Sequence, residues 1–213
     1  MSKVDFSLYL ITDRHQTAGR NLPAVVEEAL AGGVRAVQLR EKDLTPRELL
    51  ELARTLRNLT GRYGATLIIN DRVDIALTVE ADGVHLGEAS IPAAAARRLL
   101  GPDRLIGVSC HNTEGALAAE TSGADFITFG PVYPTPSKAT YGPPVGVERL
   151  SETAELLRIP VFALGGIKRE NTPEAMATGA AGIALISAII AAGNPTKEAC
   201  AFLSLLAREK RNE

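Results

Sequence analysis

Short apolar runs alternate with longer amphipathic stretches along the whole chain. Each run is five or six residues long, which is the usual length of a strand. The runs are nearly continuous in apolar residues, as expected for parallel strands that are covered on both faces. The predicted strands are residues 8–12, 36–40, 66–70, 83–87, 105–110, 126–130, 161–166 and 182–187.

The stretches between the runs have helical periodicity and helix-end signals. Thr45-Pro46 and Thr172-Pro173 each read as an N-cap followed by a proline at the first helical position, and Gly32 suits a helix C-terminus. The predicted helices are residues 22–31, 46–60, 72–79, 92–100, 114–122, 147–157, 173–178 and 196–209. Eight successive strand–helix units predict an α/β protein, a (β/α)8 TIM barrel that residues 1–213 form as a single domain.

A doubly wound open sheet is the alternative to a barrel. It usually has fewer strands, and a glycine-rich turn follows its first strand when it binds a dinucleotide. The first predicted turn here is Thr12-Asp13-Arg14-His15, which lacks that glycine fingerprint. The pattern therefore favours the barrel.

Composition narrows the classes of partner. Apolar residues make up 46% of the chain, charged residues 23%, and the net charge is -2. This balance argues against a basic nucleic-acid-binding module and leaves phosphate binding to locally placed cations. We expect no membrane span, because no apolar run reaches the required length, and no secretory leader. Cys110 and Cys200 make no disulfide framework, so a cytoplasmic location is expected.

Polar residues gather where the predicted strands end, and that end of a barrel carries the active site. Strand side chains alternate with period two, so Gln38, Arg40 and Lys42 share one face at the end of the second strand. Two cations and an amide predict a site for an anion with several oxygens, such as pyrophosphate. The alternative is that both cations pair with Glu41 and Asp43.

The third and fifth strands end on further candidates. Asn70 and Asp71 bring an amide and a carboxylate to the same rim, and a hard oxygen ligand beside a phosphate site indicates Mg2+. The alternative for Asp71 is a helix cap. Ser109 offers a hydroxyl donor, and Cys110 is expected to be a small buried filler. His111 is either structural or an acid–base group.

The longest connection follows the sixth strand and carries Thr135, Ser137 and Lys138; loops of this kind often serve as lids. Lys138 is expected to join Arg40 and Lys42 in the cationic site. A second anion site is predicted on the same rim. Gly166 and Ser187 end the last two strands, where barrels bind phosphate through backbone N–H groups. Two anion sites on one rim indicate an enzyme that joins or cleaves small phosphorylated molecules.

Eight short segments, taken in order and spacing, carry a resemblance to a known family. They are residues 9–13 (YLITD), 38–42 (QLREK), 69–71 (IND), 83–87 (GVHLG), 107–109 (GVS), 130–135 (GPVYPT), 165–167 (GGI) and 186–187 (IS). They span nearly the whole chain, which resembles the thiamine-phosphate synthase family, within a wider group that also holds the thiazole tautomerases.

The resemblance implies a reaction and a set of roles. The family couples hydroxymethylpyrimidine pyrophosphate to hydroxyethylthiazole phosphate and releases pyrophosphate, in a step in which the pyrophosphate is thought to leave first. The residues implied for the pyrimidine pyrophosphate are Gln38, Arg40, Lys42, Asn70, Ser109 and Lys138, of which Arg40, Lys42 and Lys138 are the catalytic groups. The residues implied for the thiazole phosphate are Thr135, Ser137, Gly166, Ile186 and Ser187.

One metal position departs from the family pattern. The two implied Mg2+ positions are Asp71 and Ser90, and the synthases have a second Asp where this chain has Ser90, with Glu88 as a substitute candidate. The tautomerases need no Mg2+, but they carry a His where this chain has Pro131. We therefore favour a synthase, with a thiazole tautomerase or a non-catalytic binder of thiamine precursors as the alternatives. The sequence also leaves open whether the protein forms a homo-oligomer.

Overall fold

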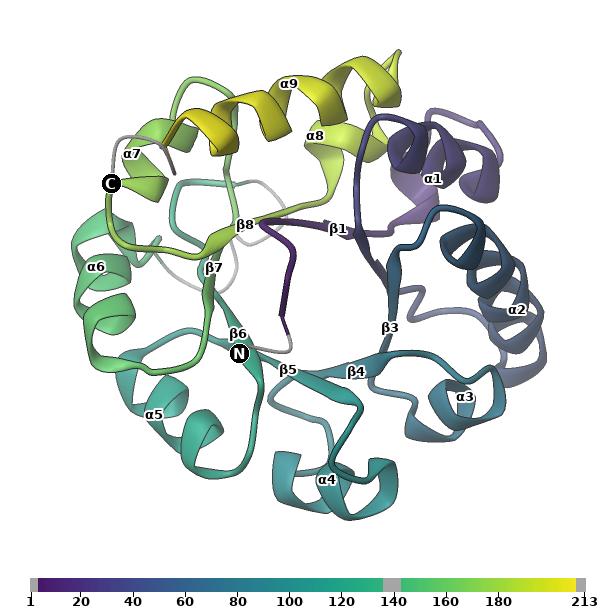
Figure 1. The fold of residues 1–213 in the computed structure, drawn as a ribbon, viewed down its shortest axis with the longest axis horizontal. Helices are drawn as coiled ribbons and strands as arrows, with labels where there is room; N and C mark the ends of the chain where they lie inside the picture. The colour runs from purple at the N-terminus through teal and green to yellow at the C-terminus, as the bar shows by residue number, and fades with distance from the viewer. Residues whose placement is uncertain (1–3, 136–142, 210–213) are drawn as a thin grey trace.

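Eight parallel strands close into a ring, in sequence order, with the helices outside it (Figure 1). The computed structural model describes residues 4–135 and 143–209. The strands are β1 (Leu8–Ile11), β2 (Ala36–Leu39), β3 (Thr66–Asn70), β4 (Gly83–Leu86), β5 (Leu105–Cys110), β6 (Phe126–Phe129), β7 (Val161–Leu164) and β8 (Gly182–Leu185). The predicted (β/α)8 barrel is confirmed.

The helices follow the strands one by one. They are α1 (Leu22–Ala31), α2 (Pro46–Arg62), α3 (Val73–Thr78), α4 (Ala93–Leu100), α5 (Thr113–Thr121), α6 (Gly146–Leu156), α7 (Thr172–Met176), α8 (Ser187–Ile190) and α9 (Pro195–Glu209). The N-cap prediction for Thr45 is confirmed by a full capping box. The one for Thr172 is wrong, because this residue is the first of α7 and Asn171 precedes it as the cap. The short α8 and a 3-10 turn, η1 (Arg14–Gln16), were not predicted.

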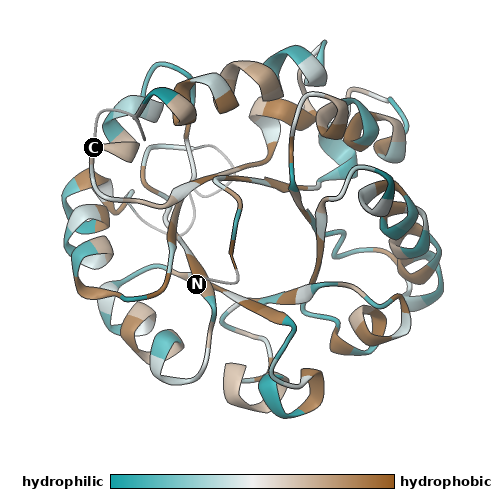
Figure 2. Cartoon of the chain, in the orientation of Figure 1, coloured by the Kyte–Doolittle hydropathy of each residue, from teal (hydrophilic) through white to brown (hydrophobic). Residues whose placement is uncertain are grey.

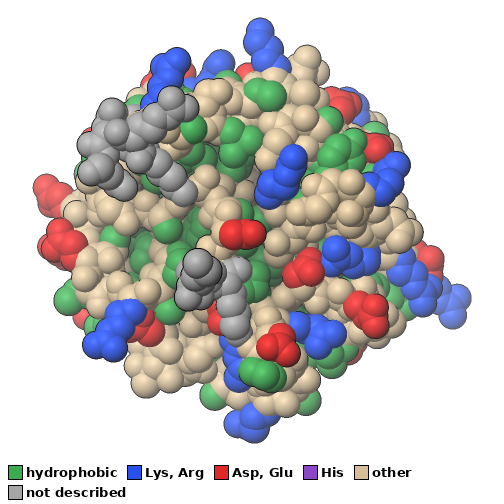
Figure 3. Space-filling model, viewed as in Figure 1, with side chains coloured by type: hydrophobic (Ala, Val, Ile, Leu, Met, Phe, Trp, Pro, Cys, Tyr) green, Lys and Arg blue, Asp and Glu red, His purple; other side chains and the backbone are tan. Residues whose placement is uncertain are grey.

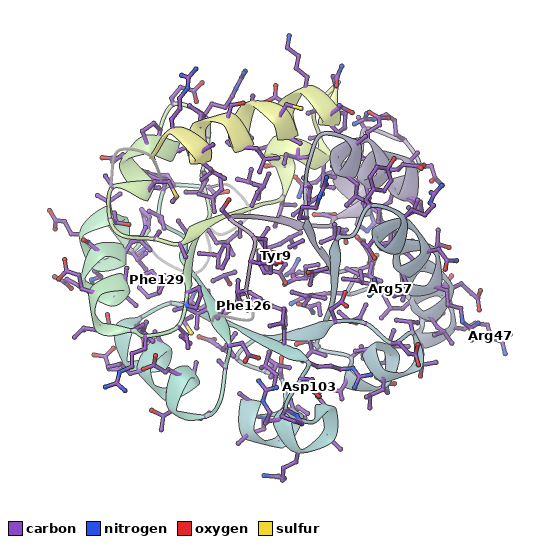
Figure 4. The ribbon with its side chains drawn as sticks, viewed as in Figure 1. Tyr9, Arg47, Arg57, Asp103, Phe126 and Phe129 are labelled. Atoms are coloured by element: carbon purple, nitrogen blue, oxygen red, sulfur yellow. The ribbon has the colours of Figure 1, made fainter. Side chains whose placement is uncertain are left out.

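Two apolar cores lie on the two sides of the ring. The larger one packs the strands against the helices and includes Val37 and Leu39, so apolar residues mark the strands and the inner helix faces in Figure 2. The smaller one fills the ring. Tyr9 and Phe126 point into it, whereas Phe129 lies outside (Figure 4). The alternation expected along β2 is therefore confirmed.

An aromatic cluster closes the end of the ring where the strands begin. The segment leading into β1 crosses that end (Figure 1) and inserts Phe6, which is 7% exposed. Its ring centroid lies 5.2 Å from that of Phe162 and 5.8 Å from that of Phe126. Edge-to-face and tilted pairs at such distances are favourable. The ring is therefore filled with side chains at this end.

Surface charges are mixed in sign. Figure 3 shows Lys and Arg interspersed with Asp and Glu on the face in view, in keeping with the near-neutral net charge. Among the helices of residues 4–135 and 143–209, none combines the length and apolarity needed to cross a membrane.

Candidate active site at the carboxyl end of the barrel

The end of β2 carries two cations at the rim. Gln38 lies inside the ring, 1% exposed, and its Nε2 donates to the Tyr9 hydroxyl at 2.9 Å. Arg40 is half-buried and Lys42 is exposed. Within the described part of the chain, neither cation forms a side-chain hydrogen bond or ion pair, and the Arg40 backbone N–H donates to Thr12 Oγ1 at 2.9 Å. Both cations therefore follow β2 without a side-chain partner among the described residues.

The neighbouring acids are paired with a different residue. Arg14 binds Glu41 through its backbone N–H, 3.1 Å from Oε2, and through Nη1 at 3.3 Å. Its guanidinium also donates to Asp43, with Nη2 at 2.7 Å from Oδ2. The alternative prediction, in which Glu41 and Asp43 neutralise the cations of their own strand, is thus wrong. The physical reason is that the loop after β1 brings a closer partner.

Glu41 also ties the loop after β2 to β1. It is 6% exposed, and its Oε1 accepts from Thr12 Oγ1 at 2.7 Å. Asp43, by contrast, is exposed, and hydrogen bonds from Arg14 and His15 hold the pKa of its carboxyl well below the usual value. The buried acid fixes the backbone that presents Arg40, and the exposed one steadies Arg14.

The Asp71 carboxylate is held at the end of β3 by two neighbours. Asn70 Nδ2 donates to Oδ2 at 2.7 Å, and the Ser90 hydroxyl donates to Oδ1. Asp71 has φ of 60°, a left-handed conformation that Asp tolerates better than most residues. No side chain caps α3, which begins at Val73. The capping interpretation of Asp71 is therefore wrong.

The donor set at this point fits Mg2+ completed by a substrate. Within residues 4–135 and 143–209, no three His, Cys, Asp or Glu side chains gather closely enough to hold a metal. Asp71 and Ser90 offer a carboxylate and a hydroxyl side by side. Mg2+ commonly takes one or two carboxylates, several waters and substrate phosphates. The arrangement matches such a site better than an all-protein cage.

Two candidates at the end of β5 have structural roles. Cys110 is 4% exposed, and burial, with a smaller effect of the nearby Glu88 charge, raises the pKa of its thiol to about 12. The predicted buried filler is confirmed, because a protonated thiol is a poor nucleophile. His111 Nδ1 donates to the Gly130 carbonyl oxygen, which favours the structural interpretation of that side chain.

A buried histidine links the inner faces of several strands. His85 is 2% exposed. Its Nε2 lies 3.0 Å from Ser109 Oγ and 3.3 Å from Thr128 Oγ1, and its Nδ1 lies 3.4 Å from the Tyr9 hydroxyl. The sequence reasoning did not single out Tyr9 or Thr128. Both residues could have been found from the period-two alternation of side chains along a strand, because each lies two residues from another inward-pointing position.

His85 is neutral at physiological pH. Burial lowers its pKa to about 3; the Asp71 charge opposes this shift and the Arg40 charge adds to it. Both charges act on the imidazole, and Asp71 also donates its backbone N–H to the His85 carbonyl oxygen at 2.9 Å. His85 thus lies beneath the part of the rim that carries Asp71 and Arg40.

The turn after β7 is shaped by the loop after β6. Gly166 has φ of +69°, and a Cβ there would lie 2.7 Å from Tyr133 Cβ and 2.8 Å from the Pro134 carbonyl oxygen. Tyr133 donates its backbone N–H to the Gly165 carbonyl at 3.0 Å and its hydroxyl to Glu174 at 2.7 Å. The missing Cβ of Gly166 therefore makes room for the loop after β6, and phosphate binding by this residue stays a prediction.

The last strand ends on an uncapped helix start. Ile186 packs against the inner core, and Ser187 is the exposed first residue of α8, which has no side-chain cap. First-turn N–H groups lack intrahelical acceptors. Thr135 is half-buried. Ser137 and Lys138 lie outside the described residues. The substrate-binding roles of all these residues stay predictions.

Fold and rim together define a barrel enzyme with a cationic mouth suited to phosphorylated small molecules. A family model described as thiamine monophosphate synthase matches residues 8–189, and the chain belongs to this family of transferases. It is 69% identical, over the full length of both chains, to a putative thiamine-phosphate synthase of Geobacter sulfurreducens. It is 44% identical to the thiamine-phosphate synthase of Clostridium novyi, over 88% of this chain and 92% of that one.

A solved structure extends the likeness to three dimensions. Thiamine phosphate pyrophosphorylase from Pyrococcus furiosus superposes with a TM-score of 0.88 and is 39% identical, covering 98% of each chain. The family resemblance predicted from the eight segments is confirmed.

Proposed function

We propose that the protein is a thiamine-phosphate synthase that condenses hydroxymethylpyrimidine pyrophosphate with hydroxyethylthiazole phosphate. The observation that carries this proposal is the pair of cations, Arg40 and Lys42, that follows β2 without a side-chain partner among the described residues. Their own neighbours, Glu41 and Asp43, are bound by Arg14. A pyrophosphate group supplies negative oxygens that can pair with these two cations.

The leaving group is the part of the reaction that needs most help. The C–O bond to pyrophosphate breaks, its electron pair stays on the pyrophosphate oxygen, and the thiazole nitrogen forms the new bond to the pyrimidine methylene carbon. Arg40 and Lys42, with Lys138 as a predicted third catalytic cation, stabilise the charge that develops on the leaving oxygen. Fixed charges at a partly dry site favour such a step strongly.

Neutral donors complete the pyrimidine pyrophosphate site. Gln38, Asn70 and Ser109 lie on β2, β3 and β5, within one arc of the ring. Asp71 and Ser90 would hold Mg2+, which would neutralise charge on the pyrophosphate. One carboxylate in place of two would bind the metal more weakly, so Asp71 and Ser90 would rely on the substrate phosphates for further ligands.

The thiazole phosphate belongs on the other side of the mouth. Ile186 supplies an apolar wall, and Ser187 supplies a hydroxyl and an uncapped backbone N–H. Thr135, Ser137 and Gly166 are the other predicted contacts of this phosphate. A site of neutral donors separates the monophosphate from the cationic half, so each substrate has its own place.

The experiment is a direct assay of the purified protein with both substrates over a series of Mg2+ concentrations. Thiamine phosphate and pyrophosphate are expected in equal amounts. Absence of product above background at every Mg2+ concentration would remove the proposal. A parallel, metal-free assay with a thiazole carboxylate phosphate tests for the tautomerase reaction, for which Pro131 stands where the tautomerases have a His.

We further propose a cytoplasmic location, which is supported by the two cysteines being free thiols. A homo-oligomer stays a prediction.

A further inference from the structure

Five polar side chains from five strands form a continuous hydrogen-bonded chain inside the ring. Gln38 Nε2 donates to the Tyr9 hydroxyl at 2.9 Å, and that hydroxyl lies 3.4 Å from His85 Nδ1. His85 Nε2 lies 3.0 Å from Ser109 Oγ, and Thr128 Oγ1 donates to the same oxygen at 3.4 Å. The chain runs from the filled interior to the mouth, where Ser109 is half-buried.

The hydrogen bond from Gln38 sets which group donates and which accepts in the rest of this hydrogen-bonded series. The Gln38 amide donates to Tyr9, so the Tyr9 proton is available for His85 Nδ1. Burial raises the pKa of Tyr9 well above its usual value, so the phenol keeps that proton. A neutral imidazole that accepts at Nδ1 carries its hydrogen on Nε2. His85 therefore donates from Nε2, and the oxygen in front of it is that of Ser109.

The Ser109 hydroxyl can act toward a ligand only as a hydrogen-bond donor. Its oxygen accepts from His85 and from Thr128, so both lone pairs are used. With Thr128 as the donor of that pair, no side chain among the described residues accepts the hydroxyl hydrogen of Ser109. This hydrogen is therefore available to a group bound at the mouth, on the strand next to the one that carries His85.

We propose that His85 is a positioning residue which, as its Nε2–H tautomer, holds the Ser109 hydroxyl as a donor to an anionic oxygen of the bound pyrophosphate. The inference rests on the proposed function for its ligand. His85 itself does not contact the substrate. A donor fixed in advance needs no reorganisation when charge develops on the leaving group. Gly107 supports the arrangement, because a Cβ there would overlap the rings of His85 and Phe126.

The first test reads the tautomer without any substrate. The chain has three histidines, His15, His85 and His111, so nitrogen NMR of protein labelled at histidine gives few signals, and a His85→Gln variant assigns the relevant pair. At pH 7 we expect His85 to show a protonated Nε2 and an unprotonated Nδ1. A protonated Nδ1 would overturn the proposal.

The second test measures coupling through Ser109. Binding of inorganic pyrophosphate with Mg2+ is followed by calorimetry in the wild type, His85→Leu, Ser109→Ala and the double variant. We expect His85→Leu to weaken binding about tenfold alone, as for loss of a charge-assisted hydrogen bond, and less than about twofold when Ser109 is already Ala. Equal effects in both backgrounds would show that His85 acts by another route.

A conservative variant separates positioning from packing. Gln places an amide nitrogen close to the position of His Nε2, so His85→Gln is expected to recover most of the pyrophosphate affinity that His85→Leu loses. If the Leu variant does not fold, the comparison of His85→Gln with the wild type in both Ser109 backgrounds decides the question. If the effects of changing His85 and Ser109 on pyrophosphate binding are coupled but the protein makes no thiamine phosphate, the proposed function is wrong and this inference stands. If the protein makes thiamine phosphate but the two effects are additive, this inference is wrong and the proposed function stands.

Discussion

The Ser90 hydroxyl donates a hydrogen bond to Oδ1 of Asp71. The side chain at position 90 thus lies against the carboxylate predicted to hold Mg2+, where a second carboxylate would share the ion. Gly87 donates its backbone N–H to Ser90 Oγ at 2.7 Å, so the hydroxyl is fixed in that place. The departure from the family pattern therefore falls on the predicted metal site itself.

Replacing Ser90 with Asp is expected to tighten Mg2+ binding. The second carboxylate adds a charged ligand, so the Mg2+ concentration for half-maximal synthesis should fall by about tenfold or more. Without metal, two facing carboxylates repel, and the variant should be less stable than the wild type in the presence of a chelator. A Mg2+ titration of activity and urea unfolding with and without metal measure both effects.

Ser90→Asn is the matched control for this change. It supplies an oxygen and a similar shape without charge, so its Mg2+ midpoint should stay close to that of the wild type. An unchanged midpoint in Ser90→Asp would show that water or another residue already supplies the missing ligand.

Lys42→Ala is expected to impair use of the pyrimidine pyrophosphate selectively. Loss of one charge-assisted contact should lower kcat/KM for that substrate by roughly 10- to 100-fold, with little change in the KM of the thiazole phosphate. Arg47→Ala is the control, because Arg47 is an exposed cation on α2 that points away from the ring (Figure 4). Equal losses for both substrates would contradict the two-site arrangement.

Glu41→Gln tests the anchor of the loop after β2. The change removes a buried charge that accepts from Thr12 and Arg14, so the free energy of unfolding should fall by about 2 to 3 kcal/mol. Asp43→Asn removes the exposed partner of the same Arg14 and should matter far less, since solvent screens it. Urea unfolding compares the two, and an equal effect would refute the anchoring role of Glu41.

His85 is expected to make stability depend on pH in mildly acidic solution. Its pKa is about 3 when folded, against the ordinary 6.5 when unfolded, so between these values the unfolded chain binds a proton that the folded one does not. Stability therefore falls as pH drops below about 6.5. From pH 7 to pH 5 the wild type should lose about 2 kcal/mol more than His85→Gln. The free energy of unfolding is measured against pH for both proteins. If it falls equally in both between pH 7 and pH 5, the burial of a neutral imidazole is contradicted.

The barrel was predictable because its signals are local. Continuous apolar runs and helix-end residues such as Thr45 and Gly32 depend only on nearby sequence, and the boundaries came out within a few residues. Period-two alternation also placed Gln38 inside the ring. The short α8 escaped prediction, because four residues are too few to show helical periodicity.

The pairing of charges was not predictable in the same way. Nothing in the sequence near Glu41 indicates that Arg14 would take it in preference to Arg40, since that choice depends on how two loops meet in space. The same holds for Gly166, where the loop after β6 occupies the Cβ direction. Contacts between distant segments decide both cases, and only the folded chain contains them.

The aromatic cluster around Phe6 packs the amino end of the ring with side chains, because Phe6, Phe126 and Phe162 lie against one another there. We therefore expect both substrates to arrive, and both products to leave, at the carboxyl end of the strands. Sharing one route makes it possible for the molecule that arrives second to delay the release of the first.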